Sequence, residues 1–186
     1  TPEMRRLAKT INFGLSYGMS GYGLAQRTGL SQEEANRFIE SYFANYPKVK
    51  AYMERTKREA AEQGYVETLL HRRRYFPELQ SKDRAHAALR RAAEREAINM
   101  PIQGTAADII KMAMIRLHEA LKKRGLKSRM ILQVHDELVL EVPEAEMEAV
   151  IPIAREAMEG AFPLAAPLKV DLKVGRNWEE MEEAPS

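Results

Sequence analysis

The chain has 186 residues, which is enough for one sizeable hydrophobic core with a lobe attached. It contains no cysteine, which excludes disulfides and thiolate metal sites, and it has no apolar run near the ~20 residues of a membrane span. The chain has 29 basic and 27 acidic side chains, of which 4 basic and 11 acidic ones lie in residues 141–186. The preceding residues therefore hold 25 basic and 16 acidic side chains, a net charge of +9. Such a body favours contact with nucleic acid, although a chance distribution of charge on a soluble protein would look the same. No apolar signal segment is present, so we expect an intracellular protein.

The first predicted element is a helix that ends near residues 17–18 and has two different faces. At about 100° per residue, one face is apolar, and the other is basic and then aromatic. The apolar stripe is Met4, Leu7, Ile11 and Leu15, and the other stripe is Arg5, Lys9, Phe13 and Tyr17. Arginine and lysine suit the oxygens of a polyphosphate, and an aromatic ring can stack on a base or sugar. An ordinary amphipathic helix with exposed rings would give the same pattern.

Capping signals and a proline predict two further helices. Ser31 with Glu34 three residues later forms a capping box, so a helix should run from there to about Asn45. Pro47 then opens a helix rich in lysine and arginine that ends near residues 63–64.

A short hairpin is predicted next, from strands at residues 65–69 and 73–76. It carries three consecutive arginines, Arg72, Arg73 and Arg74. Guanidinium groups suit a phosphate backbone, although a solvated basic turn is nearly as consistent with this sequence.

A long helical stretch follows and is expected to be disturbed by proline. The chain is strongly helical over residues 82–98, and Pro101 should kink or interrupt it, because proline cannot donate the helical hydrogen bond. A new helix should then begin with Thr105 as its cap and Asp108 closing a capping box, and run to about residues 124–125.

Three polar side chains of this stretch, Arg95, Asn99 and Gln103, are four residues apart. A helix would present them together. Long amide and guanidinium groups can reach the minor-groove acceptors that all base pairs share, which allows contact without reading sequence. A solvated polar face would have the same spacing.

Two β-rich runs at about residues 128–134 and 138–142 flank a short polar break, which predicts a second hairpin. Asp136 and Glu137 lie side by side at its tip, where like charges repel unless a cation compensates them. Mg²⁺, which prefers oxygen ligands, is the natural compensating ion, although an acidic solvated turn is the alternative.

The last predicted elements are an amphipathic helix from Pro143 to about Gly160 and a strand over residues 168–174. The whole pattern predicts an α+β fold, in which a helical region is followed by a small antiparallel sheet with packed helices.

Taken together and in this order, these patterns resemble the motifs of the family A, DNA polymerase I-like DNA polymerases. The spacing Arg-x3-Lys-x7-Tyr-Gly is similar to motif B of the fingers helix, and residues 133–137, Gln-Val-His-Asp-Glu, are similar to motif C of the palm hairpin. Residues 95–108 supply a third match, and residues 64–69 and 72–75 match a further family stretch. The resemblance covers residues 5–178, and three spaced motifs rarely agree in order by chance.

The resemblance implies template-directed DNA synthesis by two-metal nucleotidyl transfer from a dNTP to a primer 3′-hydroxyl. Two Mg²⁺ ions lower the pKa of that hydroxyl and stabilise the leaving pyrophosphate. Asp136 would bind metal with Glu137 beside it. The triphosphate would be held by Arg5 and Lys9, with Lys9 also catalytic and Arg6 a further candidate. Phe13 would lie against the sugar, and Tyr17 beside the nascent base pair.

The resemblance also implies contacts with primer-template DNA. These fall to Arg72, Arg73, Arg74, Arg95, Asn99, Gln103 and His135, the last of which would position the primer terminus. His71 departs from the family, where a glycine is common at this point, so the geometry of that hairpin turn is left open.

The family's motif A, an Asp-Tyr-Ser-like strand with the other metal-bridging aspartate, has no counterpart in this sequence. We therefore expect one set of metal ligands to be missing and the chain alone to be inactive. The N-terminal remainder of the polymerase, with motif A and the thumb, would be a partner, in the same polypeptide or as a separate chain.

The resemblance further implies a fingers region over residues 1–98, a palm portion over residues 99–186, and a cytoplasmic, nucleoid-associated protein of bacterial or phage-like type. Two other classes stay open. A metal-dependent nuclease could use the acidic hairpin without needing the first helix's stripe, and a non-catalytic DNA-binding module would need only the basic body.

Overall fold

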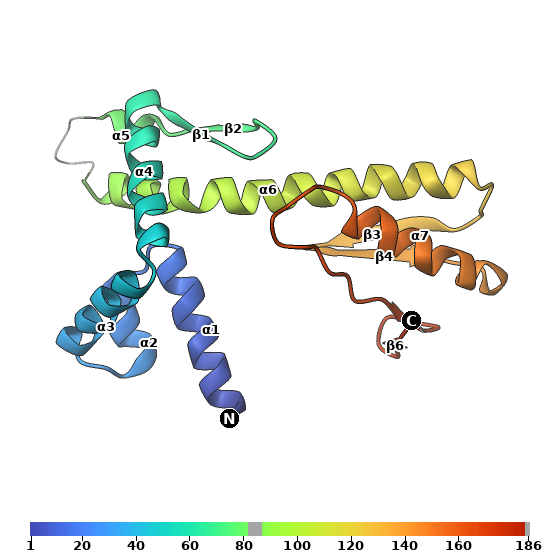
Figure 1. Ribbon diagram of the computed structural model, residues 1–186, viewed down its shortest axis with the longest axis horizontal. Coiled ribbons are helices and arrows are strands. Elements are labelled where there is room, and N and C mark those ends of the chain that lie inside the picture. Colours follow the sequence, from blue (N-terminus) through green and yellow to red (C-terminus); the bar gives the residue numbers. More distant parts are fainter. Residues whose placement is uncertain (82–86, 185–186) are drawn as a thin grey trace. The chain divides into compact units, whose positions relative to one another are not determined.

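The computed structural model describes residues 1–81 and 87–184 (Figure 1). The chain forms two compact units, Thr1–Gly104 and Thr105–Ser186, and helix α6 (Ala87–Lys123) contributes to both. Helices predominate, and the described strands pair antiparallel in two-stranded sheets. The predicted α+β class is therefore confirmed. The assignment of fingers and palm to residues 1–98 and 99–186 stays a prediction.

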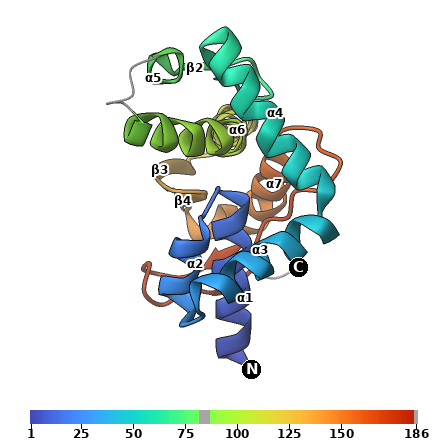
Figure 2. The ribbon, with the colours of Figure 1, turned by 90° about the vertical axis from the view of Figure 1, so that its left-hand side faces the viewer.

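The first unit begins with a run of helices: α1 (Pro2–Ser16), α2 (Gly21–Thr28), α3 (Gln32–Asn45) and α4 (Pro47–Gln63). Helices α2 and α3 lie side by side (Figure 2). The predicted capping box at the start of α3 is confirmed, because Ser31 Oγ accepts from the Glu34 amide at 3.2 Å and the Glu34 carboxylate accepts from the Ser31 amide at 2.9 Å. Helix α4 starts at Pro47, as predicted, and ends at Gly64, which is left-handed with φ of 82°.

The first hairpin consists of β1 (Tyr65–Glu67) and β2 (Arg73–Tyr75), which is shorter than predicted, and the short helix α5 (Pro77–Gln80) follows it. In its register Tyr65 faces Tyr75 and Glu67 faces Arg73. A core of small and apolar side chains joins α4, this hairpin and the first half of α6, and consists of Ala60, Val66, Phe76, Ala93, Ala97 and Met100.

Helix α6 runs without interruption through Pro101, so two predictions about this region are wrong. Pro101 does not end the helix, and Thr105 and Asp108 do not cap a new one. Both lie inside α6 and are buried, with 7% and 4% of their surface exposed. The predicted residues 82–86 of this helix lie outside the described part of the chain.

Packing explains why the helix continues past its proline. Pro101 loses one backbone hydrogen bond, yet Ala97, Ile98 and Met100 on the preceding turn are buried. The Tyr52 hydroxyl of α4 also donates to the Ile98 carbonyl at 3.1 Å. Tertiary contacts therefore hold the turn that precedes the position that the local rule marks as a break.

The second unit is a hairpin packed on two helices. Strands β3 (Arg129–Val134) and β4 (Glu137–Glu141) pair with a bulge between Met130 and Leu132. The predicted helix from Pro143 begins instead as a 3₁₀ turn, η2 (Glu144–Glu146), and continues as α7 (Met147–Glu159). The core consists of Leu117 and Leu121 from α6 with Val150, Ile153, Ala154 and Ala157 from α7.

The predicted strand over residues 168–174 is wrong for most of its length. Only β5 (Lys173–Val174) is a strand, and it pairs with β6 (Glu182–Glu183). Before it, the Val170 amide donates to the Glu159 carboxylate at 3.1 Å, and Arg155 donates to the Val170 carbonyl at 3.2 Å. Side chains of α7 thus take backbone groups that a neighbouring strand would need. Every helix in the described residues is too short or too polar to cross a membrane.

Candidate functional site

Helix α1 carries the predicted basic and aromatic stripe on an exposed side. Arg5, Lys9 and Phe13 are exposed, and Phe13 stacks on Tyr17 with ring centroids 6.3 Å apart. In the described part of the chain, no carboxylate forms an ion pair with Arg5, Arg6 or Lys9. The side chains on this face are therefore open to an anionic ligand.

The expected apolar stripe of α1 is buried only at its C-terminal end. Leu15 is fully buried, whereas Met4 and Leu7 are 68% and 42% exposed. The apolar stripe is therefore covered at Leu15 and open to solvent at Met4 and Leu7.

The end of α1 lies against the helix that carries the third motif. Gly18 has φ of 78°, and a Cβ atom on it would lie 3.3 Å from Arg95 Cγ and 3.6 Å from Ile98 Cδ1. A side chain here would meet both backbone strain and a close neighbour. The fold thus brings Gly18 next to Arg95, which lies 77 residues later in the sequence.

Arg95, Asn99 and Gln103 share one side of α6, as predicted from their spacing. Arg95 and Gln103 are exposed, and Asn99 is partly buried. The Asn99 Oδ1 atom is buried, and no group in the described residues donates a hydrogen bond to it. An unsatisfied buried amide oxygen is costly, and a ligand with a suitable donor would satisfy it.

Arg73 and Arg74 of the first hairpin already pair with carboxylates of this chain. Arg73 Nε donates to Glu67 Oε1 at 2.6 Å, and Arg74 pairs with Glu96 on α6. The hydrogen bond from Arg73, followed by that of His71, lowers the pKa of the Glu67 carboxyl. A phosphate bound by these arginines would have to replace or share their internal carboxylates.

The turn of this hairpin packs closely on α6. His71 adopts φ of 61°, a left-handed conformation that glycine would adopt at less cost, and its Nδ1 lies 3.2 Å from Glu67 Oε2. At the other side of the turn, a Cβ atom on Gly104 would lie 2.6 Å from Thr68 Cγ2. The glycine therefore allows the hairpin to sit beside Gln103.

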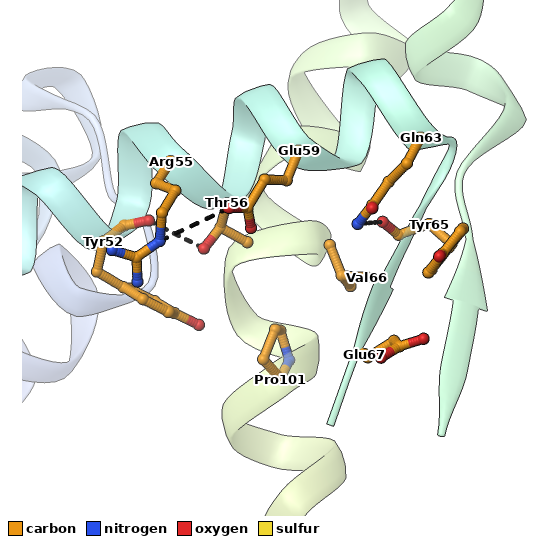
Figure 3. Close-up of a pocket in the computed structure, with 9 residues that line it drawn as sticks. All are labelled: Tyr52, Arg55, Thr56, Glu59, Gln63, Tyr65, Val66, Glu67 and Pro101. Atoms are coloured by element: carbon orange, nitrogen blue, oxygen red, sulfur yellow. Dashed lines mark hydrogen bonds and ion pairs between the residues drawn. The ribbon is translucent and has the colours of Figure 1, made fainter. Parts of the chain in front are cut away.

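A hollow of polar character lies between α4, β1 and Pro101 of α6, and Figure 3 shows its lining. Tyr52 and Arg55 of α4 lie at one end, and Tyr65 of β1 lies at the other (Figure 3). Burial raises the pKa of the Tyr52 hydroxyl. None of the side chains that the sequence predicted as functional lines this hollow.

The second hairpin presents its carboxylates at the tip. Val134 pairs with Glu137, which leaves His135 and Asp136 as a two-residue loop, and His135 adopts φ of 54°. Gln133 Nε2 donates to the His135 carbonyl at 2.9 Å. Asp136 and Glu137 are both exposed.

The chemistry of these two carboxylates fits an oxygen-preferring cation in part. Adjacent exposed carboxylates can bind Mg²⁺, which commonly keeps several waters. Within residues 1–81 and 87–184, however, no group of three or more acidic, histidine or cysteine side chains is positioned around a common point.

The fold also reveals one contact that no sequence pattern indicates. The Tyr42 hydroxyl of α3 donates to Asn12 Oδ1 of α1 at 2.7 Å. The two residues are distant in sequence, and neither belongs to a motif. Only the tertiary structure identifies this pair.

Comparisons with known proteins all match DNA polymerases of one family. The profile of DNA polymerase family A matches residues 1–180. The chain is 53% identical over 177 residues to the thermostable DNA polymerase I of Thermus aquaticus and 56% identical over 178 residues to DNA polymerase I of Pseudomonas aeruginosa. These matches cover 95% and 96% of this chain but 21% and 19% of those proteins, so the chain spans about a fifth of their length.

A solved structure agrees with these relatives. The chain is similar, at a TM-score of 0.85 and 50% identity, to the polymerase domain of Pol1 from M. smegmatis in complex with DNA primer-template and dNTP. That match covers 91% of this chain and 29% of the other.

Proposed function

The chain belongs to DNA polymerase family A, and from this premise we propose that it forms the part of a DNA-directed DNA polymerase that holds the incoming dNTP and the primer terminus. One observation carries the proposal. The exposed cations Arg5 and Lys9 of α1 lack carboxylate partners in the described chain, and they lead along one face to the stacked rings of Phe13 and Tyr17. This order matches a triphosphate, a sugar and a base in turn.

On the nucleotide, Arg5 and Lys9 would neutralise charge that builds on the triphosphate during in-line displacement. Arg6 is exposed on the same helix and is a further candidate for this role. Phe13 would lie against the sugar and Tyr17 against the nascent pair. Because the cations are fixed on a helix, they need little reorganisation when the reaction occurs.

On the DNA, Arg95, Asn99 and Gln103 would meet the minor groove at the last base pair. Their amide and guanidinium groups would donate to the minor-groove acceptors that all base pairs share. The backbone would be met by Arg72, Arg73 and Arg74, the last two of which would exchange internal carboxylates for phosphates. His135 at the tip of the second hairpin would position the primer terminus.

Asp136, with Glu137 beside it, would hold Mg²⁺ at the tip of the second hairpin. When bound, two such ions lower the pKa of the primer hydroxyl and stabilise the leaving pyrophosphate. Remaining ligands would come from the part of the polymerase that carries motif A. On this proposal the chain by itself should not synthesise DNA.

The test uses the complete polymerase and measures single-nucleotide incorporation beside DNA affinity. Lys9→Ala should lower kcat/KM for the dNTP by about 10²–10³-fold, since it removes a group that stabilises transition-state charge. Lys48→Ala, which removes an exposed lysine from α4, is the matched control and should change little. Asp136→Ala should abolish incorporation with DNA affinity within a few fold, because binding rests mainly on phosphate contacts.

The results also separate the other classes. If Lys9→Ala and Arg5→Ala change only DNA affinity and its salt dependence, α1 is a backbone clamp and the nucleotide assignment is wrong. Strand degradation without incorporation would indicate a nuclease. DNA binding that is insensitive to Mg²⁺, with neither reaction, would indicate a binding module.

A further inference from the structure

Helix α1 is tied to α3 by a hydrogen bond from the Tyr42 hydroxyl to Asn12 Oδ1, at 2.7 Å. The Tyr42 ring is partly buried and packs against two other rings, with centroid distances of 5.4 Å to Phe43 and 4.9 Å to Tyr46. These two ring contacts restrict the Tyr42 side chain while its hydroxyl donates to Asn12.

Asn12 lies on the same side of α1 as the candidate phosphate-binding cations. At about 100° per residue, it is roughly 20° from Arg5 and 60° from Lys9 around the helix axis. It also directly precedes Phe13. A bond to Asn12 therefore constrains the rotation of the face that the proposed function assigns to the nucleotide.

The other anchors of α1 lie at its C-terminal end. Leu15 is fully buried, the Met19 amide donates to the Gly14 carbonyl at 2.8 Å, and Gly18 lies against Arg95. Met4 and Leu7 are exposed. In the described chain, the bond from Tyr42 is the one side-chain hydrogen bond between α1 and another helix.

Because α1 is packed at its C-terminal end, a small tilt of the helix would displace its N-terminal residues. Lys9 is nine residues from Gly18, or about 13 Å at 1.5 Å per residue, so a tilt of about 10° would move it by about 2 Å. A shift of that size is enough to break hydrogen bonds between Lys9 and a bound triphosphate, which weakens dNTP binding. The hydrogen bond to Asn12, which lies between Lys9 and Gly18, therefore has a large effect on the position of Lys9.

We infer that Tyr42 is a positioning residue of this polymerase, which acts through Asn12 to set the orientation of the nucleotide-holding face of α1. The inference rests on the proposed function, because it assigns Tyr42 a role only if α1 binds the nucleotide. Tyr42 itself contacts no reacting group.

The test is a double-mutant cycle in the complete polymerase. Tyr42→Phe removes only the hydroxyl and should raise the KM for dNTP about three- to tenfold, the range expected for one neutral hydrogen bond. The kcat at saturating dNTP and the DNA affinity should stay near wild type. Asn12→Ala should have a similar effect, and the double variant should be no worse than either single variant.

Tyr46→Phe is the matched control. Tyr46 belongs to the same aromatic group, and no hydrogen bond of its hydroxyl occurs in the described chain, so this variant should keep the wild-type KM. A general loss of helix packing would instead lower kcat and DNA affinity together with the melting temperature.

An unchanged KM in Tyr42→Phe, or additive effects in the double variant, would overturn the inference. Lys9→Ala, measured in parallel, separates the two levels. If Lys9→Ala impairs dNTP use and Tyr42→Phe does not, the positioning role alone fails. If Lys9→Ala leaves dNTP use intact, the nucleotide assignment fails and the positioning role fails with it.

Discussion

Gly104→Ala tests how the first hairpin is seated on α6. A Cβ atom at this position would lie 2.6 Å from Thr68 Cγ2, which is far inside van der Waals contact. Thr68 is 4% exposed, and its Oγ1 accepts from the amides of Leu70 and Arg72 at 3.2 and 3.1 Å. Rotation of Thr68 away from the new methyl group would break both hydrogen bonds of the turn.

The expected magnitude follows from two effects. Alanine stabilises a helix interior by about 1 kcal/mol relative to glycine. The new methyl group costs about 1–3 kcal/mol, either as overpacking or as loss of the two turn hydrogen bonds at about 0.5–1.5 kcal/mol each. The helix preference of alanine is the same whether the hairpin is open or closed, so we expect the free energy of opening the hairpin to fall by about 1–3 kcal/mol, which raises the equilibrium constant for local opening by about 5- to 160-fold.

Hydrogen exchange of the amides at Leu70 and Arg72, in the complete polymerase, measures this opening. Gly104→Ala should increase their exchange rates by that factor, with other regions unchanged. Thr68→Ser removes Cγ2 and keeps the hydroxyl, so the double variant should recover most of the protection. Unchanged or slower exchange in Gly104→Ala, or no recovery in the double variant, would refute the packing argument.

Two further predictions concern the nucleotide face and the hairpin. Phe13→Tyr should raise dideoxynucleotide use relative to the normal substrate by about tenfold to a few hundredfold, because a hydroxyl replacing the missing 3′-OH is worth roughly 1–3 kcal/mol; an unchanged ratio in a competition assay would mean that the ring does not face the sugar. The pKa of Glu67 is lowered by Arg73 and then His71, so its contribution to hairpin stability is present above the unfolded pKa of about 4.3 and is lost as pH falls through the lower folded value. As the pH is lowered through that range, the protection of the hairpin amides, corrected for intrinsic exchange, should decrease in wild type and decrease less in Glu67→Gln. Equal pH profiles in the two proteins would contradict the stabilising role of the Glu67 carboxylate.

Local signals in the sequence predicted much of the first unit. The Ser31–Glu34 capping box and Pro47 act on the backbone within one turn, so they mark the starts of α3 and α4 without help from the rest of the fold. The two hairpins also follow from strands separated by short turns. Motif spacing likewise predicted which residues share a face of α1 and of α6, because a helix converts spacing directly into a shared face.

Local signals failed where packing outweighed them. Pro101 and Thr105 look like a helix end and a helix start, yet buried neighbours on both sides hold α6 as one helix. Residues 168–172 alternate as a strand should, yet the Glu159 and Arg155 side chains take the backbone groups at Val170. In each case the deciding contact comes from residues outside the local window.

By itself, the sequence determined which side chains have chemistry suited to phosphate, sugar, base or metal binding. Within one helix or hairpin, it also determined which of these side chains lie together. The tertiary structure alone decided which elements meet. It joined Gly18 to Arg95 and Tyr42 to Asn12, and it left Met4 and Leu7 of the apolar stripe on α1 exposed while it buried Leu15. The physical reason is that hydrogen bonds and periodicity within an element depend on neighbours a few residues away, whereas contacts between elements depend on burial and shape across the whole chain.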